Sequence, residues 1–174
     1  NALSEWEGLD PAYAVDGEEV RWHVDSDGFR LPTEAEWEYA CRAGSTGPQY
    51  GPLAEIAWTA ADGVTSPQPI GGKLPNLHGL FDTLGNVWEW CWDFLDTERY
   101  DRYRVFRGGG FADDAWSVRA GTRRGSGPLT THDDVGFRVA RGGFDGTDAA
   151  QGWSARGDAI SAVSNIPHGW SRIR

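Results

Sequence analysis

The sequence predicts an irregular α+β fold with low regular secondary structure, and three observations lead to this prediction. The chain holds 24 Gly and 10 Trp in 174 residues, which is typical of tightly turned loops held by large rings. Three Trp alternate in the stretch Trp88–Trp92, so all three indoles fall on one strand face, with Glu89 and Cys91 on the other. Thr33 and Glu36 have the spacing of a capping box, which predicts one well-defined helix.

Length and charge limit the possible classes of protein. The 174 residues suffice for one domain, which we divide into a main body, 1–141, and a C-terminal arm or tail, 142–174, too poor in apolar residues for its own core. A net charge of −10 argues against a nucleic-acid partner. No apolar run approaches the length of a membrane span, so no membrane partner is expected. Cys41 and Cys91 lack CxxC spacing, which predicts buried reduced thiols and a cytoplasmic location.

The first half of the chain predicts two helices and a hairpin. Residues 1–7 read as the end of a helix that Gly8 stops, and the missing N-terminal cap indicates that the chain is a fragment. Residues 13–24 read as a hairpin that turns at a glycine. Residues 33–44 form the capped helix, with Trp37, Ala40, Cys41 and Gly44 at helical spacing on its inner face.

The second half predicts loops and strands around the Trp-rich stretch. Residues 45–77 lack periodicity and read as an ordered loop region pinned by aromatic side chains. Residues 104–111 predict a strand that runs into a glycine bend. Residues 116–120 predict a short strand or helical turn, and residues 135–140 a final strand.

Five motifs in one order carry a resemblance to a known family. They are Gly28–Ala40, Pro75–Asp82, Gly85–Trp90, Arg107–Gly109 and Gly136–Arg138. Together they resemble the formylglycine-generating enzyme, or sulfatase-modifying factor, domain family. The similarity covers roughly residues 1–141, which look like the C-terminal two-thirds of such a domain.

The resemblance implies a C-type-lectin-like fold and several kinds of activity. Members of the family include the copper oxidase that converts a sulfatase cysteine to formylglycine, related sulfoxide synthases, and ligand-binding modules. In such a fold the first strands pair with the last one. We therefore expect an N-terminal fragment of the same domain, a second protein chain or the 142–174 tail to cover residues 135–140.

One departure from the family pattern bears on the chemistry. The oxidase keeps its two metal-binding cysteines between the Arg-Gly-Gly and Gly-Phe-Arg motifs, and residues 110–135 contain no Cys here. Copper(I) chemistry needs thiolates, so a copper cofactor is not expected. We favour a non-oxidase recognition module that binds a small-molecule or protein ligand. The alternative is a metal-dependent oxidase of the same family whose catalytic residues come from a missing N-terminal part or another chain.

The loop before the last strand supplies the candidate ligand contacts. Its acidic, basic, aromatic and imidazole side chains would form the ligand face: Asp113, Asp114, Trp116, Arg119, Arg123, Arg124 and His132. A His-carboxylate metal site around His132 is conceivable, although acidic loop residues are usually just solvated. Arg107 and Arg138 are instead expected to pair with buried carboxylates such as Glu36 or Asp93.

A calcium site is the second candidate. The resemblance implies that Asn86 and Glu89 help to hold a calcium ion, and their amide and carboxylate oxygens are suitable hard ligands. The competing interpretation is structural: Asn86 takes the positive-φ position of a turn, and Glu89 binds buried backbone groups.

Overall fold

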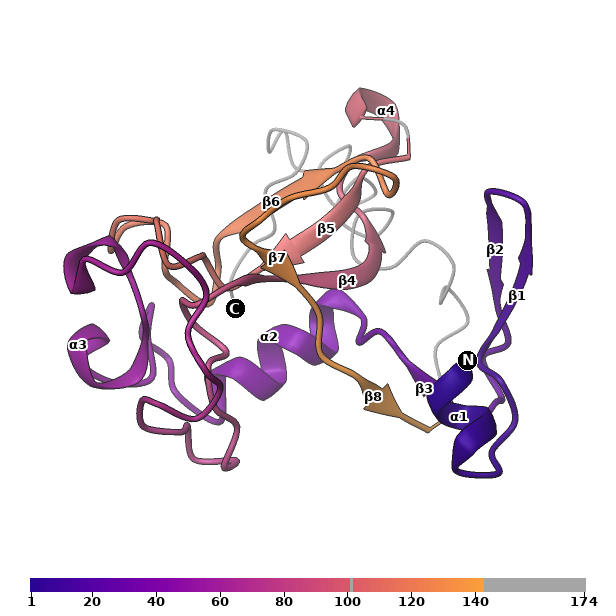
Figure 1. The fold of residues 1–174 in the computed structure, drawn as a ribbon, viewed down its shortest axis with the longest axis horizontal. Coiled ribbons are helices and arrows are strands. Elements are labelled where there is room, and N and C mark those ends of the chain that lie inside the picture. The colour runs from indigo at the N-terminus through magenta and orange to yellow at the C-terminus, as the bar shows by residue number, and fades with distance from the viewer. Residues whose placement is uncertain (101, 143–174) are drawn as a thin grey trace.

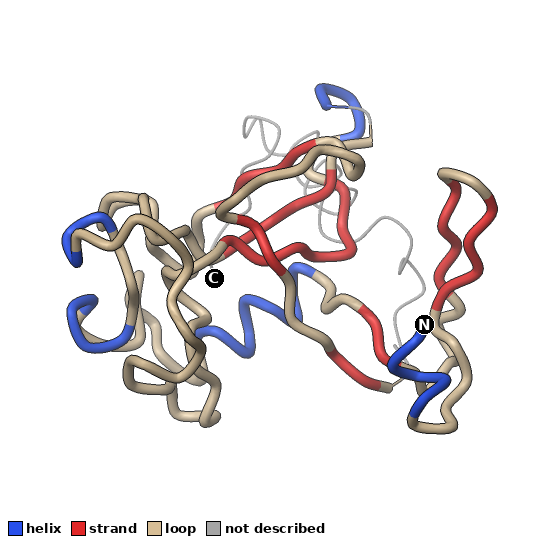
Figure 2. The backbone as a smooth tube through the Cα atoms, viewed as in Figure 1, coloured by secondary structure: helices blue, strands red, loops and turns tan. Residues whose placement is uncertain are grey.

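Short helices and strands are joined by long loops in the computed structural model, which describes residues 1–100 and 102–142 (Figures 1 and 2). The helices are α1 Ala2–Trp6, α2 Glu34–Arg42, α3 Leu53–Ile56, the 3₁₀ helix η1 Ala60–Asp62, and α4 Thr97–Tyr100. The strands are β1 Tyr13–Asp16, β2 Glu19–Trp22, β3 Phe29–Arg30, β4 Trp88–Phe94, β5 Arg104–Arg107, β6 Arg123–Ser126, β7 Val135–Gly136 and β8 Ala140–Arg141. This mixed, loop-rich architecture confirms the predicted fold class. The expected C-terminal arm, 142–174, lies outside the described residues except for Gly142.

One four-stranded sheet organises the molecule. Its order is β6-β5-β4-β7, with β4 antiparallel to β5 and parallel to β7, while β1-β2 and β3-β8 are separate two-stranded pairs. The predicted final strand is therefore two strands that pair with different partners, and residues 137–139 connect them. Figure 1 shows this connection crossing in front of α2 on its way from β7 to β8.

Helix α2 confirms the capping-box prediction. The Thr33 side chain accepts the Glu36 N–H, and the Glu36 carboxylate accepts the Thr33 N–H in return. The helix ends at Ala43, which adopts the left-handed conformation. The half-buried Glu38–Arg42 pair also forms as the i,i+4 spacing predicts, at 2.8 Å.

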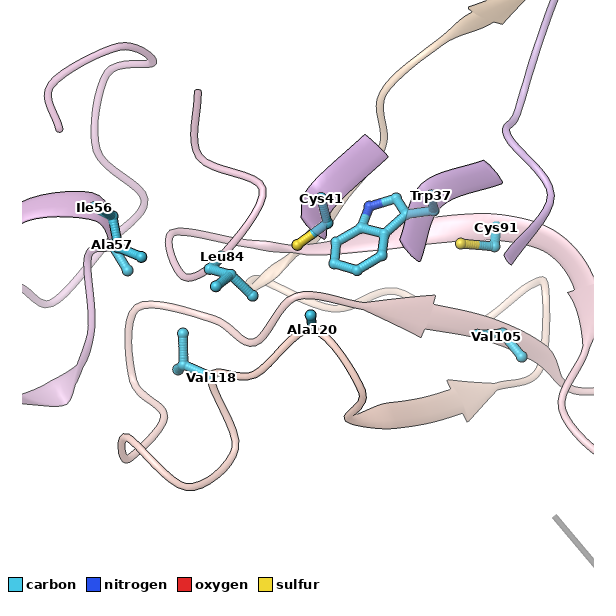
Figure 3. Packing of buried hydrophobic residues seen from close by; sticks show 9 residues of the cluster. All are labelled: Trp37, Cys41, Ile56, Ala57, Leu84, Cys91, Val105, Val118 and Ala120. Carbon is cyan, nitrogen blue, oxygen red and sulfur yellow. The ribbon is translucent and has the colours of Figure 1, made fainter. Parts of the chain in front are cut away.

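The hydrophobic core fills the space between α2, the sheet and the loops beside them. Figure 3 shows the Trp37 indole lying between the two cysteine sulfur atoms, above β4 and β5. The cluster consists of Trp37, Cys41, Ile56, Ala57, Leu84, Cys91, Val105, Val118 and Ala120. Both thiols are buried and unbonded, which confirms the prediction made from their spacing.

Two of the three indoles of the Trp-rich strand share an aromatic neighbour. Trp88 and Trp90 both meet Phe106 edge to face, with ring centroids 5.5 and 5.1 Å away. The pairing of β4 with β5 then shifts between Trp90 and Phe94. Trp92 instead stacks on Tyr13 at 4.9 Å. Such irregularities re-aim side chains, which is consistent with a different ring partner for Trp92 than for Trp88 and Trp90.

The loop regions contain turns, two short helices and one strand. Residues 116–120 form turns, and the strand of this region is β6, whose Arg123-Arg124-Gly125-Ser126 sequence lacks any apolar alternation. The 45–77 loop region is confirmed as largely irregular but contains α3 and η1. No helix in the described part of the chain is long and apolar enough to cross a membrane.

Candidate functional site

Strand register sends the neighbouring Arg123 and Arg124 to opposite faces of the sheet. Phe106 is the Cα partner of Arg124, and Arg107 is the partner of Arg123. Because side chains directly opposite each other share a face, Arg124 joins Phe106 on the outer face. Arg123 joins Arg107 on the inner face, which packs against α2.

Arg124 lies over Trp88 and pairs with Asp113 on the outer face. Its guanidinium carbon is 4.6 Å from the centre of the Trp88 ring, and its Nη2 is 3.0 Å from Asp113 Oδ1. Asp113 Oδ2 accepts the Trp88 indole N–H at 2.7 Å and the Gly110 backbone N–H at 2.8 Å. Three donors therefore fix this carboxylate, while the Arg124 side chain remains 45% exposed.

His132 completes this group from the far end of the loop. Its ring meets Phe106 edge to face at 5.9 Å, and its Nε2 is buried without a hydrogen-bond partner among the described residues. The Asp134 carbonyl accepts the Trp88 N–H at 2.8 Å, which anchors the loop to β4. We call Trp88, Phe106, Asp113, Arg124 and His132 the outer site.

The other loop candidates lie elsewhere. Asp114, Trp116 and Arg119 are exposed, and the Trp116 side chain is 64% accessible, so they are open to solvent as expected. Arg123 departs from the expectation of a surface contact. Its Nε and Nη2 pair with Glu34 at 2.5 and 2.8 Å, and its side chain is only 15% exposed. Arg123 therefore forms an internal ion pair and is not a surface ligand contact.

A buried ionic network lies under the inner face. Arg107 and Glu34 are paired, each with 1% of its side chain exposed, and Arg107 Nη2 is 2.6 Å from Glu38. Burial alone would lower the pKa of Arg107, but the Glu34 and Glu38 carboxylates outweigh it and raise the pKa. The internal pairing predicted for Arg107 is confirmed.

The carboxylates that were expected to pair with Arg107 and Arg138, namely Glu36 and Asp93, were the wrong ones. Glu36 pairs with Arg30 at 2.7 Å, and Asp93 accepts the Glu34 N–H at 2.7 Å. Arg138 pairs with Glu89, from Nε to Oε2 at 2.5 Å and from Nη2 to Oε1 at 2.6 Å.

The side chains of Asn86 and Glu89 both form hydrogen bonds with other parts of the protein. Asn86 has φ 62°, and its amide oxygen accepts the Gln68 N–H at 2.7 Å while its Nδ2 donates to the Gln68 carbonyl at 3.0 Å. Glu89 accepts the Trp37 indole N–H at 2.6 Å in addition to its pair with Arg138. As a calcium pair these two residues do not fit, because a cation would have to displace Gln68 and compete with Arg138.

Asp82 is a residue that the sequence reasoning missed. It is 6% exposed and has φ 53°, and its Oδ2 accepts the Gly71 N–H at 2.7 Å. Its Oδ1 is buried and has no hydrogen-bond partner among the described residues. An unsatisfied buried carboxylate oxygen is a suitable ligand for a hard cation. The sequence reveals neither the positive φ of Asp82 nor the burial of its carboxylate.

The two cysteines do not fit a copper site. They come from α2 and β4, and the Trp37 indole lies between their sulfur atoms (Figure 3). Burial raises the pKa of Cys41 to about 11 and that of Cys91 well above its usual value of 9.0. Within residues 1–100 and 102–142, no three His, Cys, Asp or Glu side chains are grouped to hold a metal ion.

These pKa shifts make a prediction about thiol reactivity. The thiolate is the reactive form, so Cys41 and Cys91 should resist Ellman's reagent in the folded chain at pH 8. Both should react promptly in denaturant. Kinetics followed by absorbance check this, and rapid modification of the folded chain would contradict the buried placement.

Comparison with known proteins places this geometry in a family context. The family model described as "Sulfatase-modifying factor enzyme 1-like domain" matches residues 3–142. A formylglycine-generating enzyme of Streptomyces coelicolor is 36% identical over 146 residues, covering 65% of this chain and 46% of the relative. The inactive C-alpha-formylglycine-generating enzyme 2 of Bos taurus is 34% identical over 152 residues, covering 76% of this chain and 50% of the relative.

A solved structure agrees with these matches. The Treponema denticola variable protein 1 superposes with a TM-score of 0.73 at 29% identity, covering 81% of this chain and 66% of that one. The chain spans about half the length of the two curated relatives.

Proposed function

Because the chain belongs to the sulfatase-modifying factor enzyme 1-like domain family, we propose that it is a non-oxidase member that binds a ligand at its outer site. The observation that carries this proposal is the arrangement of Arg124 and Asp113 over Trp88 in a loop that contains no cysteine. The half-exposed guanidinium offers bidentate donors to a carboxylate or phosphate group of a ligand.

Rigid support distinguishes the outer site from an ordinary solvated loop. The Asp113 carboxylate is held by an indole, a backbone amide and a guanidinium, and Trp88 beneath it is only 1% exposed. Recognition sites benefit from such preorganisation, because less ordering is needed when the ligand binds. The relative of Bos taurus that is named inactive is consistent with a family member without oxidase chemistry.

Alanine substitution tests the proposed ligand contact. On a microarray of short acidic and phosphorylated peptides, the wild-type chain should bind a defined subset, and Arg124→Ala should weaken that binding roughly tenfold. Asp113 would keep the Trp88 and Gly110 donors, so the variant should stay folded. Arg99→Ala removes a matched half-exposed arginine, paired with Asp96 at 3.7 Å, and should bind as wild type. Equal losses from both variants would contradict the outer site.

The alternative function is a metal-dependent oxidase completed by an N-terminal part or another chain. The Streptomyces coelicolor relative favours it, because that relative is named a formylglycine-generating enzyme. Copper loading followed by oxygen uptake on a cysteine-containing peptide separates the two functions. Stoichiometric copper with oxygen uptake would overturn the recognition proposal.

We also propose a calcium ion held partly by Asp82, in place of the pair Asn86 and Glu89. The support is the unpartnered Asp82 Oδ1, and backbone carbonyls are ligands of the same hard type. Calcium should raise the melting temperature of the wild-type chain, since a ligand that binds the folded state stabilises it. Asp82→Asn should abolish that rise, whereas Asp114→Asn on the surface should keep it. An identical calcium response in all three chains would exclude this site.

We propose further that a partner covers the connection between β7 and β8. Phe137 and Val139 in this connection are 68% and 47% exposed, and β7 is an edge strand of the described sheet. An N-terminal part of the same domain or a second chain is the expected cover. Hydrogen exchange of residues 135–141 should slow when a chain that carries an N-terminal part of the domain replaces this one.

A further inference from the structure

The hairpin β1–β2 projects from the rest of the described residues. Figure 1 shows it standing apart from the four-stranded sheet, joined to the body at its base beside α1. Within the described residues its two strands pair only with each other, so each has a free edge. A lone two-stranded hairpin is marginally stable in water, and free edges are open to pairing with another strand.

The two faces of the hairpin differ in chemistry. The register pairs Tyr13 with Trp22 and Val15 with Val20, and period two places these pairs on one face. At the base Tyr13 and Trp22 contact Trp92, at 4.9 and 5.8 Å between ring centroids. Further out, Val15 and Val20 are 63% and 40% exposed. The apolar face that begins at the core therefore continues into solvent.

The charge around this face is strongly negative. Residues 1–27 carry eight carboxylates and one Arg, which is seven of the ten net negative charges of the chain. All eight acidic residues are exposed. Among the described residues, the only ion pair that they form joins Glu19 to Arg102 at 3.2 Å, with both side chains more than half exposed. An exposed pair of this kind neutralises little of the local potential.

We propose that the hairpin is a docking site for an extended, Lys/Arg-rich polypeptide segment. The segment would add a strand to a free hairpin edge and place aliphatic side chains on Val15 and Val20. Its cationic side chains would meet the surrounding carboxylates. Backbone pairing and apolar contact supply the affinity, and the charge selects a basic partner and speeds association.

Charge argues against the other occupants. A second copy of the chain would bring another strongly acidic hairpin against the first, and like charges in an interface are unfavourable. Residues 143–174 contain three acidic and three Arg residues, so they offer no net positive charge to this face. A basic partner is the occupant that satisfies both the free edge and the acidic surroundings. This inference is independent of the outer site.

Peptide binding to the full chain tests the docking site. The probe is a fluorescent peptide of alternating Lys and Val, compared with the same peptide carrying Glu in place of Lys. Anisotropy should show that the Lys-Val peptide binds and the Glu-Val peptide does not, with affinity falling as salt rises. Glu18→Lys should weaken binding roughly three- to fivefold at low salt. Val15→Thr with Val20→Thr should weaken it further while keeping β-propensity.

A matched charge reversal provides the control. Glu55→Lys changes the net charge equally at an exposed position of α3 and should bind as wild type. Loss of binding equal to that of Glu18→Lys would show a non-specific charge effect and overturn the proposal. Absence of Lys-Val binding to the full chain would overturn it as well. Self-association that Val15→Thr/Val20→Thr abolishes would identify a second copy as the occupant instead.

Discussion

Replacing Arg107 by Leu should lower the free energy of unfolding by about 3–5 kcal/mol, because it removes one partner of a buried ionic network. Arg107 and Glu34 are each 1% exposed, and Arg107 also holds Glu38 and the Ala120 carbonyl. Without the guanidinium, Arg123 is the one cationic partner that Glu34 keeps among the described residues. Urea denaturation at pH 7 would measure the loss.

Arg102→Leu is the matched control for this substitution. Arg102 pairs with Glu19 at 3.2 Å, with 58% and 63% of the two side chains exposed. Exposed pairs of this kind contribute about 0–1 kcal/mol. If Arg107→Leu cost no more than Arg102→Leu, the buried network would not stabilise the fold as its burial indicates.

Local sequence rules predicted α2 and the shared face of Trp88 and Trp90. The Thr33–Glu36 capping box depends on residues three apart, and the shared face of Trp88 and Trp90 depends on strand periodicity alone. Both features are fixed by neighbours in sequence. They are therefore present in the folded chain as predicted, whereas the ring partner of Trp92 lies in a distant segment, at Tyr13.

Tertiary register decided what the sequence left open. Arg123 and Arg124 look alike as neighbouring loop cations, and only the pairing of β6 with β5 sends one to Glu34 and the other to Asp113. Likewise, Arg107 meets Glu34 across 73 residues of sequence. Ion-pair partners at such separations follow from packing, so the family motif that contains Arg107 could indicate internal pairing without identifying Glu34.

The candidate calcium ligands also show that sequence does not reveal side-chain direction. Asn86 was a reasonable ligand by residue type, but its positive-φ turn directs the amide to the Gln68 backbone. Asp82 carries the unpartnered oxygen because its own positive φ holds the carboxylate in the interior. Side-chain direction, rather than ligand chemistry, separates the two residues.

The second large effect concerns Trp37, whose indole is 1% exposed between α2 and the sheet. Trp37→Ala should cost about 3–5 kcal/mol in free energy of unfolding, because it leaves a large cavity. It also removes the N–H that donates to Glu89 Oε2 at 2.6 Å. Trp6→Ala, at a side chain 82% exposed, should change stability by less than about 0.5 kcal/mol.

Trp37→Phe separates the two contributions of the indole. Phe keeps an aromatic ring in the core but offers no donor, so among the described residues the Glu89 carboxylate would keep its pair with Arg138 alone. Loss of one donor to a buried carboxylate should cost about 1–3 kcal/mol, which is less than the cavity of Trp37→Ala. Equal losses for Phe and Ala would assign the role of Trp37 to orienting Glu89. If Trp37→Phe left the free energy of unfolding nearly unchanged, the role of Trp37 would be packing alone.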